Sequence, residues 1–237
     1  MNIGFILAGG LGLRMKMSSS LPKQFSVLGE RPILMHTIER FEAHKNIDCI
    51  CVVCLETWEH YLTETIQSYN FKKVRWIVSG GETRQQSVYN GLCALENDCS
   101  SDDIVVVHDG VRPFITNEVI SQNIELALMK KSAMTGYRST DTLVTSPNGK
   151  NAASSLDRDT TFTIQTPQTY RLGYGLKQYR RAYAADMVNT VNCCELFIKL
   201  GERIHIVNGL KTNIKLTTED DIAYIEALNK IFHEKSN

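Results

Sequence analysis

The sequence of 237 residues has no excess charge of either sign, because 26 lysines and arginines balance 26 aspartates and glutamates. It therefore lacks the broad basic surface that holds nucleic acid or an anionic membrane, and we expect neither as a partner. No apolar run approaches the roughly 20 residues of a membrane span, and the first residues lack the pattern of a secretory signal. These absences predict a cytoplasmic protein.

The seven cysteines form neither a disulfide scaffold nor a metal-binding pattern. Cys49 and Cys51 share one face of an expected strand, whereas Cys54 points to the other face. Three thiols divided between two faces cannot close a tetrahedral metal site, so we interpret them as small buried packing groups. Cys193 and Cys194, neighbours on an expected helix, receive the same interpretation. The six histidines show no ligand spacing.

Three common nucleotide-binding signatures are also missing. The dinucleotide fingerprint G-x-G-x-x-G fails because Met15 stands three residues after Gly12, which argues against a nicotinamide oxidoreductase. No Walker loop G-x-x-x-x-G-K-[ST] exists. The segment His108-Asp109-Gly110 lacks the second carboxylate of the Asp-x-Asp motif that a glycosyltransferase would normally carry at its metal site.

The N-terminal segment of the chain has an unusual sequence. Residues 3–7 form an apolar run that predicts a buried strand, and a glycine-rich loop, 8–12, follows it. Backbone N–H groups in such a loop can form a concave anion site, to which Arg14 and Lys23 add two cations. Two cations suit a polyphosphate better than a single phosphate. An ordinary strand-to-helix turn remains the alternative for the glycines alone.

Further along the chain, apolar runs alternate with segments of helical periodicity. This alternation predicts a mostly parallel, twisted sheet with helices on both faces, an α/β fold of Rossmann-like type. Ligands gather at the carboxyl ends of the strands in such folds, so the 9–12 loop, Gly80-Gly81 and His108-Asp109 should meet at one edge. We expect strands at 3–7, 47–55, 74–78, 104–107, 203–207 and 211–216. We expect helices at 33–42, 58–69, 84–95, 117–130, 175–184, 190–200 and from 217 onward. Asn117 should cap the fourth of these helices, and the last should pack against the core through Ile222, Ile225, Leu228 and Phe232.

Residues 139–165 differ in character from the rest of the single domain expected for 1–237. They are polar, poor in core residues and centred on the turn signal Ser146-Pro147-Asn148-Gly149. Long structureless loops in compact domains are usually functional or disordered. We interpret the segment as a hairpin-like arm, and the alternative is a floppy insertion.

Five separated motifs resemble one enzyme family in the family's own order. They are LAGGLGLRM with PKQ, GGETRQQSV, VHDGVRP, LDR followed by QTPQ, and NIKLT. The chain resembles the cytidylyltransferases that act on methylerythritol phosphate or ribitol phosphate. The resemblance implies that CTP and a phosphorylated polyol react to a CDP-polyol and pyrophosphate, that Mg²⁺ assists, and that the 139–165 arm completes a homodimer.

The resemblance also implies roles for individual residues. Lys23, Lys215 and Arg14 would be catalytic cations that offset phosphate charge. Asp109 would hold Mg²⁺, although capping the next turn is an alternative. The CTP-binding residues would be Leu7, Ala8, Gly9, Gly10, Gly12, Gly80, Gly81, Arg84, Ser87 and Asp109, and the polyol-phosphate-binding residues Arg112, Asp141, Thr142 and Arg158.

Departures from the family pattern concern the second substrate. The methylerythritol-phosphate enzymes usually read H-D-A-A-R-P where this chain has Gly110-Val111, and Thr-Asp where it has Val191-Asn192. We therefore favour ribitol 5-phosphate or a similar polyol phosphate, used for a capsule or teichoic-type polymer. Methylerythritol phosphate in isoprenoid synthesis is the first alternative, and a non-catalytic CTP-binding module is the second.

Overall fold

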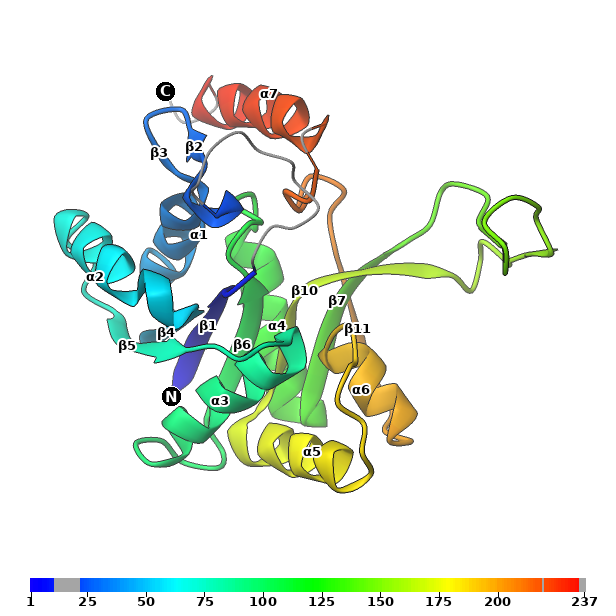
Figure 1. Cartoon of the computed structure of the whole chain (residues 1–237), viewed down its shortest axis with the longest axis horizontal. Coiled ribbons are helices and arrows are strands. Elements are labelled where there is room, and N and C mark those ends of the chain that lie inside the picture. Colours follow the sequence, from blue (N-terminus) through cyan, green and yellow to red (C-terminus); the bar gives the residue numbers. More distant parts are fainter. Residues whose placement is uncertain (11–21, 219, 235–237) are drawn as a thin grey trace.

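A twisted seven-stranded sheet forms the centre of the computed structural model, which describes residues 1–10, 22–218 and 220–234 (Figure 1). The predicted roles of Gly12 and Arg14 lie outside these residues. The strand order is β11-β7-β10-β6-β1-β4-β5, and all neighbours are parallel except β10, which is antiparallel to both β6 and β7. The strands are β1 (Asn2–Ala8), β4 (Cys49–Cys54), β5 (Val74–Ser79), β6 (Ile104–Asp109), β7 (Ser132–Arg138), β10 (Phe162–Arg171) and β11 (Ile206–Asn208).

Helices cover both faces of this sheet, which confirms the predicted fold class. One apolar core joins the sheet to α1 (Ile33–Glu42), α2 (Glu59–Ser68) and α4 (Asn117–Lys130). A second core joins the opposite face to α3 (Arg84–Glu96), α5 (Leu172–Ala184) and α6 (Cys193–Lys199). A smaller cluster seats α7 (Asp220–Glu234) through Ile225 against Leu28, Phe114 and Leu216.

The cysteines of β4 pack as predicted. Cys54 belongs to the first core, whereas Cys49 and Cys51 belong to the second. Burial raises the pKa of the Cys49 thiol to about 11 and that of Cys54 to about 12, so both stay protonated at neutral pH. Alternation along a strand therefore placed these thiols on opposite faces.

Several elements differ from the sequence prediction: strands β7 and β10 were not expected, and the strand expected at 203–207 is β11 at Ile206–Asn208. Segment 211–216 is a loop and not a strand. The Leu216 N–H donates to the Val111 carbonyl at 3.0 Å, and the Asn213 carbonyl accepts from the Arg112 side chain at 2.7 Å. These bonds satisfy the backbone without a neighbouring strand. The cap of α4 is Thr116, whose Oγ1 accepts from the Val119 N–H, and Asn117 is the first helical residue.

The chain between β7 and β10 extends away from the body of the molecule as a long excursion (Figure 1). Every residue from 140 to 160 is exposed. Only a short ribbon, β8 (Val144–Thr145) paired with β9 (Ser154–Ser155), gives it regular structure. Residues 162–165 of the expected arm belong instead to β10. The protruding hairpin is thus observed, and its proposed role in a dimer stays a prediction.

Smaller elements surround the carboxyl ends of the central strands. They are the short helices η1 (Lys23–Phe25) and η2 (Glu56–Trp58) and the ribbon of β2 (Val27–Leu28) with β3 (Arg31–Pro32). Among the described helices, none combines the length and apolar character needed to cross a lipid bilayer.

Candidate active site

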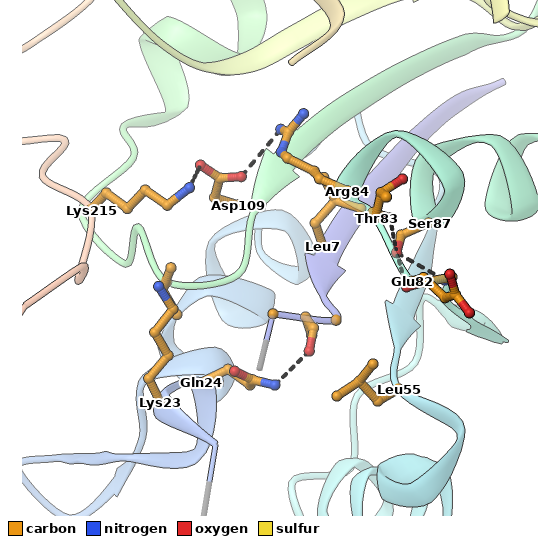
Figure 2. A pocket seen from close by; sticks show the side chains of 15 residues that line it. Leu7, Lys23, Gln24, Leu55, Glu82, Thr83, Arg84, Ser87, Asp109 and Lys215 are labelled. Atoms are coloured by element: carbon orange, nitrogen blue, oxygen red, sulfur yellow. Dashed lines mark hydrogen bonds and ion pairs between the residues drawn. The ribbon is translucent and has the colours of Figure 1, made fainter. Parts of the chain in front are cut away.

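A cavity of about 400 Å³ opens at the carboxyl ends of β1 and β6. As expected from the parallel strands, segments far apart in the sequence meet there (Figure 2). Figure 2 shows Lys23 and Lys215 on one side of the hollow and residues that lead into α3 on the other. The lining residues are Leu7, Ala8, Gly9, Gly10, Lys23, Gln24, Leu55, Gly81, Glu82, Thr83, Arg84, Ser87, Asp109, Val111 and Lys215.

Asp109, the last residue of β6, forms ion pairs with the cationic side chains of the site. Its Oδ2 lies 2.9 Å from Lys215 Nζ and 3.3 Å from Arg112 Nε, and its Oδ1 lies 3.3 Å from Arg84 Nη2. The side chain of Asp109 is only 8% exposed. One buried carboxylate therefore gathers three cations, which leaves the group with a net charge of about +2 when all four are ionised.

This arrangement sets the protonation state of the carboxyl group. Burial by itself would raise the pKa of Asp109, but the charges of Lys215, Arg84 and Arg112 hold it well below its ordinary value. Asp109 is accordingly ionised throughout the physiological range. The site is pre-organised to receive an anion.

Lys23 approaches from the short helix η1. Its Nζ donates to the Leu216 carbonyl at 3.1 Å, in the loop that carries Lys215. Gln24, the next residue, donates from Nε2 to the Ala8 carbonyl at 2.6 Å and so fixes η1 against the end of β1. The two predicted catalytic lysines within the described residues thus lie around one hollow.

Ser87 shapes the loop between β5 and α3. Its Oγ accepts from the Gly81 N–H at 3.0 Å and donates to the Thr83 carbonyl at 2.9 Å. Gly80 packs closely against this hydroxyl, because a Cβ at position 80 would lie only 2.9 Å from Ser87 Oγ. A glycine is therefore needed for the hydroxyl to reach the loop. Gly80 does not line the cavity, whereas Gly81 and Ser87 do.

Gly10 is different, because a Cβ at this position would meet none of the described residues within 4 Å. The residue lines the cavity, and its φ is not positive. Within the described part of the chain, neither packing nor backbone geometry explains the glycine. We therefore interpret it as a position where a ligand approaches the backbone.

The residues predicted to bind the polyol phosphate separate into two groups. Arg112 lies next to the cavity through its ion pair with Asp109. Asp141, Thr142 and Arg158 are exposed on the arm and do not line the hollow of their own chain. Sequence reasoning assigned no role to Gln24, Leu55, Glu82 and Thr83, and it noted Val111 only as a departure from the family motif. Thr83 could have been found from the spacing Thr-x-x-Gln, because its Oγ1 accepts from the Gln86 N–H and caps α3.

The described residues contain no group of three or more acidic, histidine or cysteine side chains placed to hold a metal ion. Asp109 can supply one carboxylate ligand, as Mg²⁺ often requires when phosphate oxygens supply the rest. Both of its oxygens are engaged by cations in this structure. The donor set therefore fits a metal that arrives with a polyphosphate, and it does not form a metal site by itself.

Comparisons with known proteins point to one enzyme family. A sequence model for the family described as IspD, 2-C-methyl-D-erythritol 4-phosphate cytidylyltransferase, matches residues 3–230. A ribitol-5-phosphate cytidylyltransferase of Vibrio parahaemolyticus serotype O3:K6 is 37% identical over 228 residues, which are 96% of this chain and 95% of the relative.

A 2-C-methyl-D-erythritol 4-phosphate cytidylyltransferase of Clostridium acetobutylicum is 36% identical over 231 residues, which are 97% of this chain and 98% of that protein. The fold also matches the crystal structure of 4-diphosphocytidyl-2C-methyl-D-erythritol synthase from Anaerococcus prevotii, with a TM-score of 0.81 and 28% identity. That match covers 97% of this chain and 96% of the other.

Proposed function

This chain belongs to the 2-C-methyl-D-erythritol 4-phosphate cytidylyltransferase family, and we propose that it transfers the cytidylyl group of CTP to ribitol 5-phosphate or a similar sugar-alcohol phosphate. The products would be a CDP-polyol and pyrophosphate. The observation that carries the proposal is the convergence of Lys23, Arg84 and Lys215 on one cavity, where the buried carboxylate of Asp109 pairs with Arg84 and Lys215.

The reaction places two polyanions in contact, so neutralising charge and aligning the reactants are the main tasks. A phosphate oxygen of the polyol phosphate attacks the α-phosphorus of CTP, and the bond to the bridging oxygen of the β-phosphate breaks. Lys23 offsets the charge on the departing pyrophosphate. Lys215, on the loop that accepts a hydrogen bond from Lys23, offsets charge between the α-phosphate and the incoming phosphate. Arg14 is proposed to assist Lys23.

The glycine-rich end of β1 and the start of α3 are proposed to hold the nucleotide. The open side of Gly10 gives the triphosphate access to the backbone. The Gly81–Ser87 contact fixes the loop that would face the cytosine, with no need for a side chain to reach the base. The cavity volume of about 400 Å³ lies within the usual range for small-molecule sites.

Mg²⁺ is the proposed metal cofactor, with Asp109 as its candidate protein ligand and phosphate oxygens as the other ligands. When bound, the ion would supply positive charge to the phosphates. Among the cations of the described residues, Asp109 Oδ1 contacts only Arg84, so this oxygen keeps a lone pair for the ion. The incoming phosphates would supply the anionic charge that balances the ion and the three cations.

The choice of ribitol 5-phosphate over methylerythritol phosphate rests on the second-substrate side of the cavity. Val111, one of the departures from the usual family motif, lines the hollow. Asn192 does not help to decide, because its side chain caps α6 by accepting from the Glu195 N–H at 3.0 Å, as an aspartate would. Methylerythritol phosphate remains the alternative, since relatives of both types are similar at 36–37% identity.

A homodimer is proposed through the 139–165 arm. The arm exposes three apolar side chains, Leu143 (37%), Val144 (53%) and Leu156 (43%), which a second copy could cover. Arg158 would then reach the polyol phosphate in the partner's site. We further propose that the protein acts in the cytoplasm, where CTP is available. Its product would be used for the synthesis of a capsule or teichoic-type polymer.

The decisive experiment measures CTP-dependent pyrophosphate release with ribitol 5-phosphate, other alditol phosphates and methylerythritol phosphate in parallel. We expect ribitol 5-phosphate or another alditol phosphate to give the highest kcat/KM. Preference for methylerythritol phosphate would replace the proposed substrate by the alternative. Binding of CTP without release in the presence of any of these compounds would favour a non-catalytic module. Light scattering of the purified protein tests the dimer.

A further inference from the structure

Thr166, on β10, forms hydrogen bonds beneath the cation cluster although it does not line the cavity. Its side chain accepts from the backbone N–H of Asp109 at 3.1 Å, and it also lies 3.1 Å from Nδ1 of His108. Thr166 is 3% exposed and His108 is fully buried. The hydroxyl therefore joins the strand that ends in Asp109 to its antiparallel neighbour.

The direction of these bonds follows from His108. Its Nε2 faces the Arg112 carbonyl at 3.1 Å, and a carbonyl can only accept, so Nε2 carries the proton. With Nε2 as the donor, an uncharged ring keeps Nδ1 as an acceptor, which takes the hydrogen bond of the Thr166 hydroxyl. The ring thus closes the turn between Asp109 and Arg112 without adding charge.

Asn213 extends the same network to the loop that carries Lys215. Its Nδ2 donates to the Thr166 carbonyl at 2.8 Å, and its own carbonyl accepts from Arg112 Nη1 at 2.7 Å and from Gln165 Nε2 at 3.1 Å. Asn213 is 1% exposed. On the other side of Lys215, the Leu216 N–H donates to the Val111 carbonyl, so both flanks of Lys215 are fixed.

We propose that Thr166 and Asn213 are positioning residues, which act through Asp109, Arg112 and Lys215 to hold the cations where the phosphate of the second substrate binds. The inference rests on the proposed function for its substrate, but its geometry does not depend on it. Each contact fixes a different member of the cluster: Thr166 fixes Asp109, the carbonyl of Asn213 fixes Arg112, and the Asn213 side chain fixes the loop of Lys215.

The chemistry explains why such a network would be needed. Three cations around one carboxylate repel one another and would otherwise spread apart. Rate enhancement by charge stabilisation requires that donors are already in place when the transition state forms. Small displacements of positioned groups cost large factors in rate. A buried and neutral scaffold, tied to the cluster by the hydrogen bonds of Thr166 and Asn213, supplies that rigidity without adding charge.

The test compares Thr166→Val, which keeps the shape and removes the hydroxyl, with Thr166→Ser, which keeps the hydroxyl. Leaving the Asp109 N–H and His108 Nδ1 unpaired should raise KM for the polyol phosphate or lower kcat by roughly 5- to 100-fold. KM for CTP should stay within about twofold, and Thr166→Ser should restore most of the loss. Asn213→Ala should likewise impair the use of the polyol phosphate while KM for CTP stays within about twofold. If circular dichroism shows that Thr166→Val does not fold, the Asn213→Ala variant becomes the test of the proposal.

A second readout needs no turnover. Calorimetric titration with inorganic pyrophosphate, without metal, reports on the cation cluster directly, and the valine variant should bind it several-fold more weakly than the serine variant. Equal kinetics and equal pyrophosphate binding in the two variants would overturn the inference. An equal loss for CTP and polyol phosphate that serine fails to restore would also overturn it. A wild-type protein that binds pyrophosphate but turns over no polyol phosphate would refute only the proposed function.

Discussion

Lys215 and Asp109, which come from a loop before α7 and from the end of β6, form an ion pair of 2.9 Å between Nζ and Oδ2. The same carboxylate also binds Arg84 and Arg112. A buried anion therefore keeps three cations together while no phosphate is present. When phosphates enter, they can take over these contacts, and the cations need little rearrangement.

Lys215→Ala should lower kcat by about 100- to 1,000-fold, because a cation that stabilises the transition state is lost. Initial rates of pyrophosphate release at saturating substrates measure this. Lys177→Ala, an exposed lysine on α5, serves as the control and should stay near the wild-type rate. A Lys215→Ala enzyme with nearly normal kcat would exclude a catalytic role for this ammonium group.

Asp109→Asn should weaken the dependence on Mg²⁺, because an amide is a poorer ligand than a carboxylate. We expect the Mg²⁺ concentration for half-maximal rate to rise several-fold at a fixed CTP concentration. A titration of both proteins from micromolar to millimolar Mg²⁺ measures the change. If the two titration curves coincide, Asp109 organises the cations and is no metal ligand.

The stability difference between wild type and Asp109→Asn should depend on pH in a defined direction. The folded pKa of Asp109 lies below its ordinary value, so its contribution is present above about pH 4 and is lost as the pH falls toward the folded value. The wild type should need more urea than the variant at pH 7 and pH 5. That gap should narrow below about pH 4, and a constant gap down to pH 3 would contradict the assignment.

Gly10→Ala and Gly110→Ala should separate ligand binding from packing. A Cβ at Gly10 would meet none of the residues that the structure describes, so thermal stability should not change while KM for CTP rises. A Cβ at Gly110 would approach Leu34 Cδ1 to 2.7 Å and the Leu7 carbonyl to 3.0 Å, and overpacking of this kind costs about 1–3 kcal/mol. Thermal melts and CTP kinetics on both variants test this. A destabilised Gly10→Ala protein with unchanged KM would reverse the interpretation.

Arg158→Ala should raise KM for the polyol phosphate several-fold and leave KM for CTP nearly unchanged, since the arginine is proposed to reach only the second substrate. Lys150→Ala, also exposed on the arm, is the matched control. Mixing Arg158→Ala protein with inactive Lys215→Ala protein adds a further test. Recovery of part of the activity in the mixture would indicate that Arg158 acts across subunits, whereas unaltered polyol kinetics in Arg158→Ala would remove it from the site.

Much of the fold could be predicted because its signals are local. The apolar runs of β1, β4 and β6 and the periodic helices between them specify parallel strands with covered faces. The strands β7 and β10 were not predicted, and β10 shows why. It buries Gln165, Thr166, Gln168 and Thr169, whose polar groups resemble a loop in sequence. Their partners lie on distant elements, as when Gln168 Oε1 accepts from the Cys193 N–H at 2.9 Å.

The same distinction applies to the site. The motifs PKQ, VHDGVRP and NIKLT pointed to Lys23, Asp109 and Lys215, and these residues do line one cavity. The motifs could not show that Asp109 binds three cations, or that Thr166 and Asn213 support the cluster from below. Hydrogen bonds between residues so far apart in the chain leave no periodicity or spacing in the sequence.

The α/β architecture, the edge of the sheet where charged residues gather, and the family could be inferred from the chain alone, because hydrophobic periodicity and short motifs are local features of a sequence. The folded arrangement was needed to show that segment 211–216 is a loop that brings Lys215 to the cavity, and that Ser87 holds the Gly81 loop. These hydrogen bonds form between buried polar groups that still lack a partner after the strands have packed. Which groups these are depends on the complete tertiary structure.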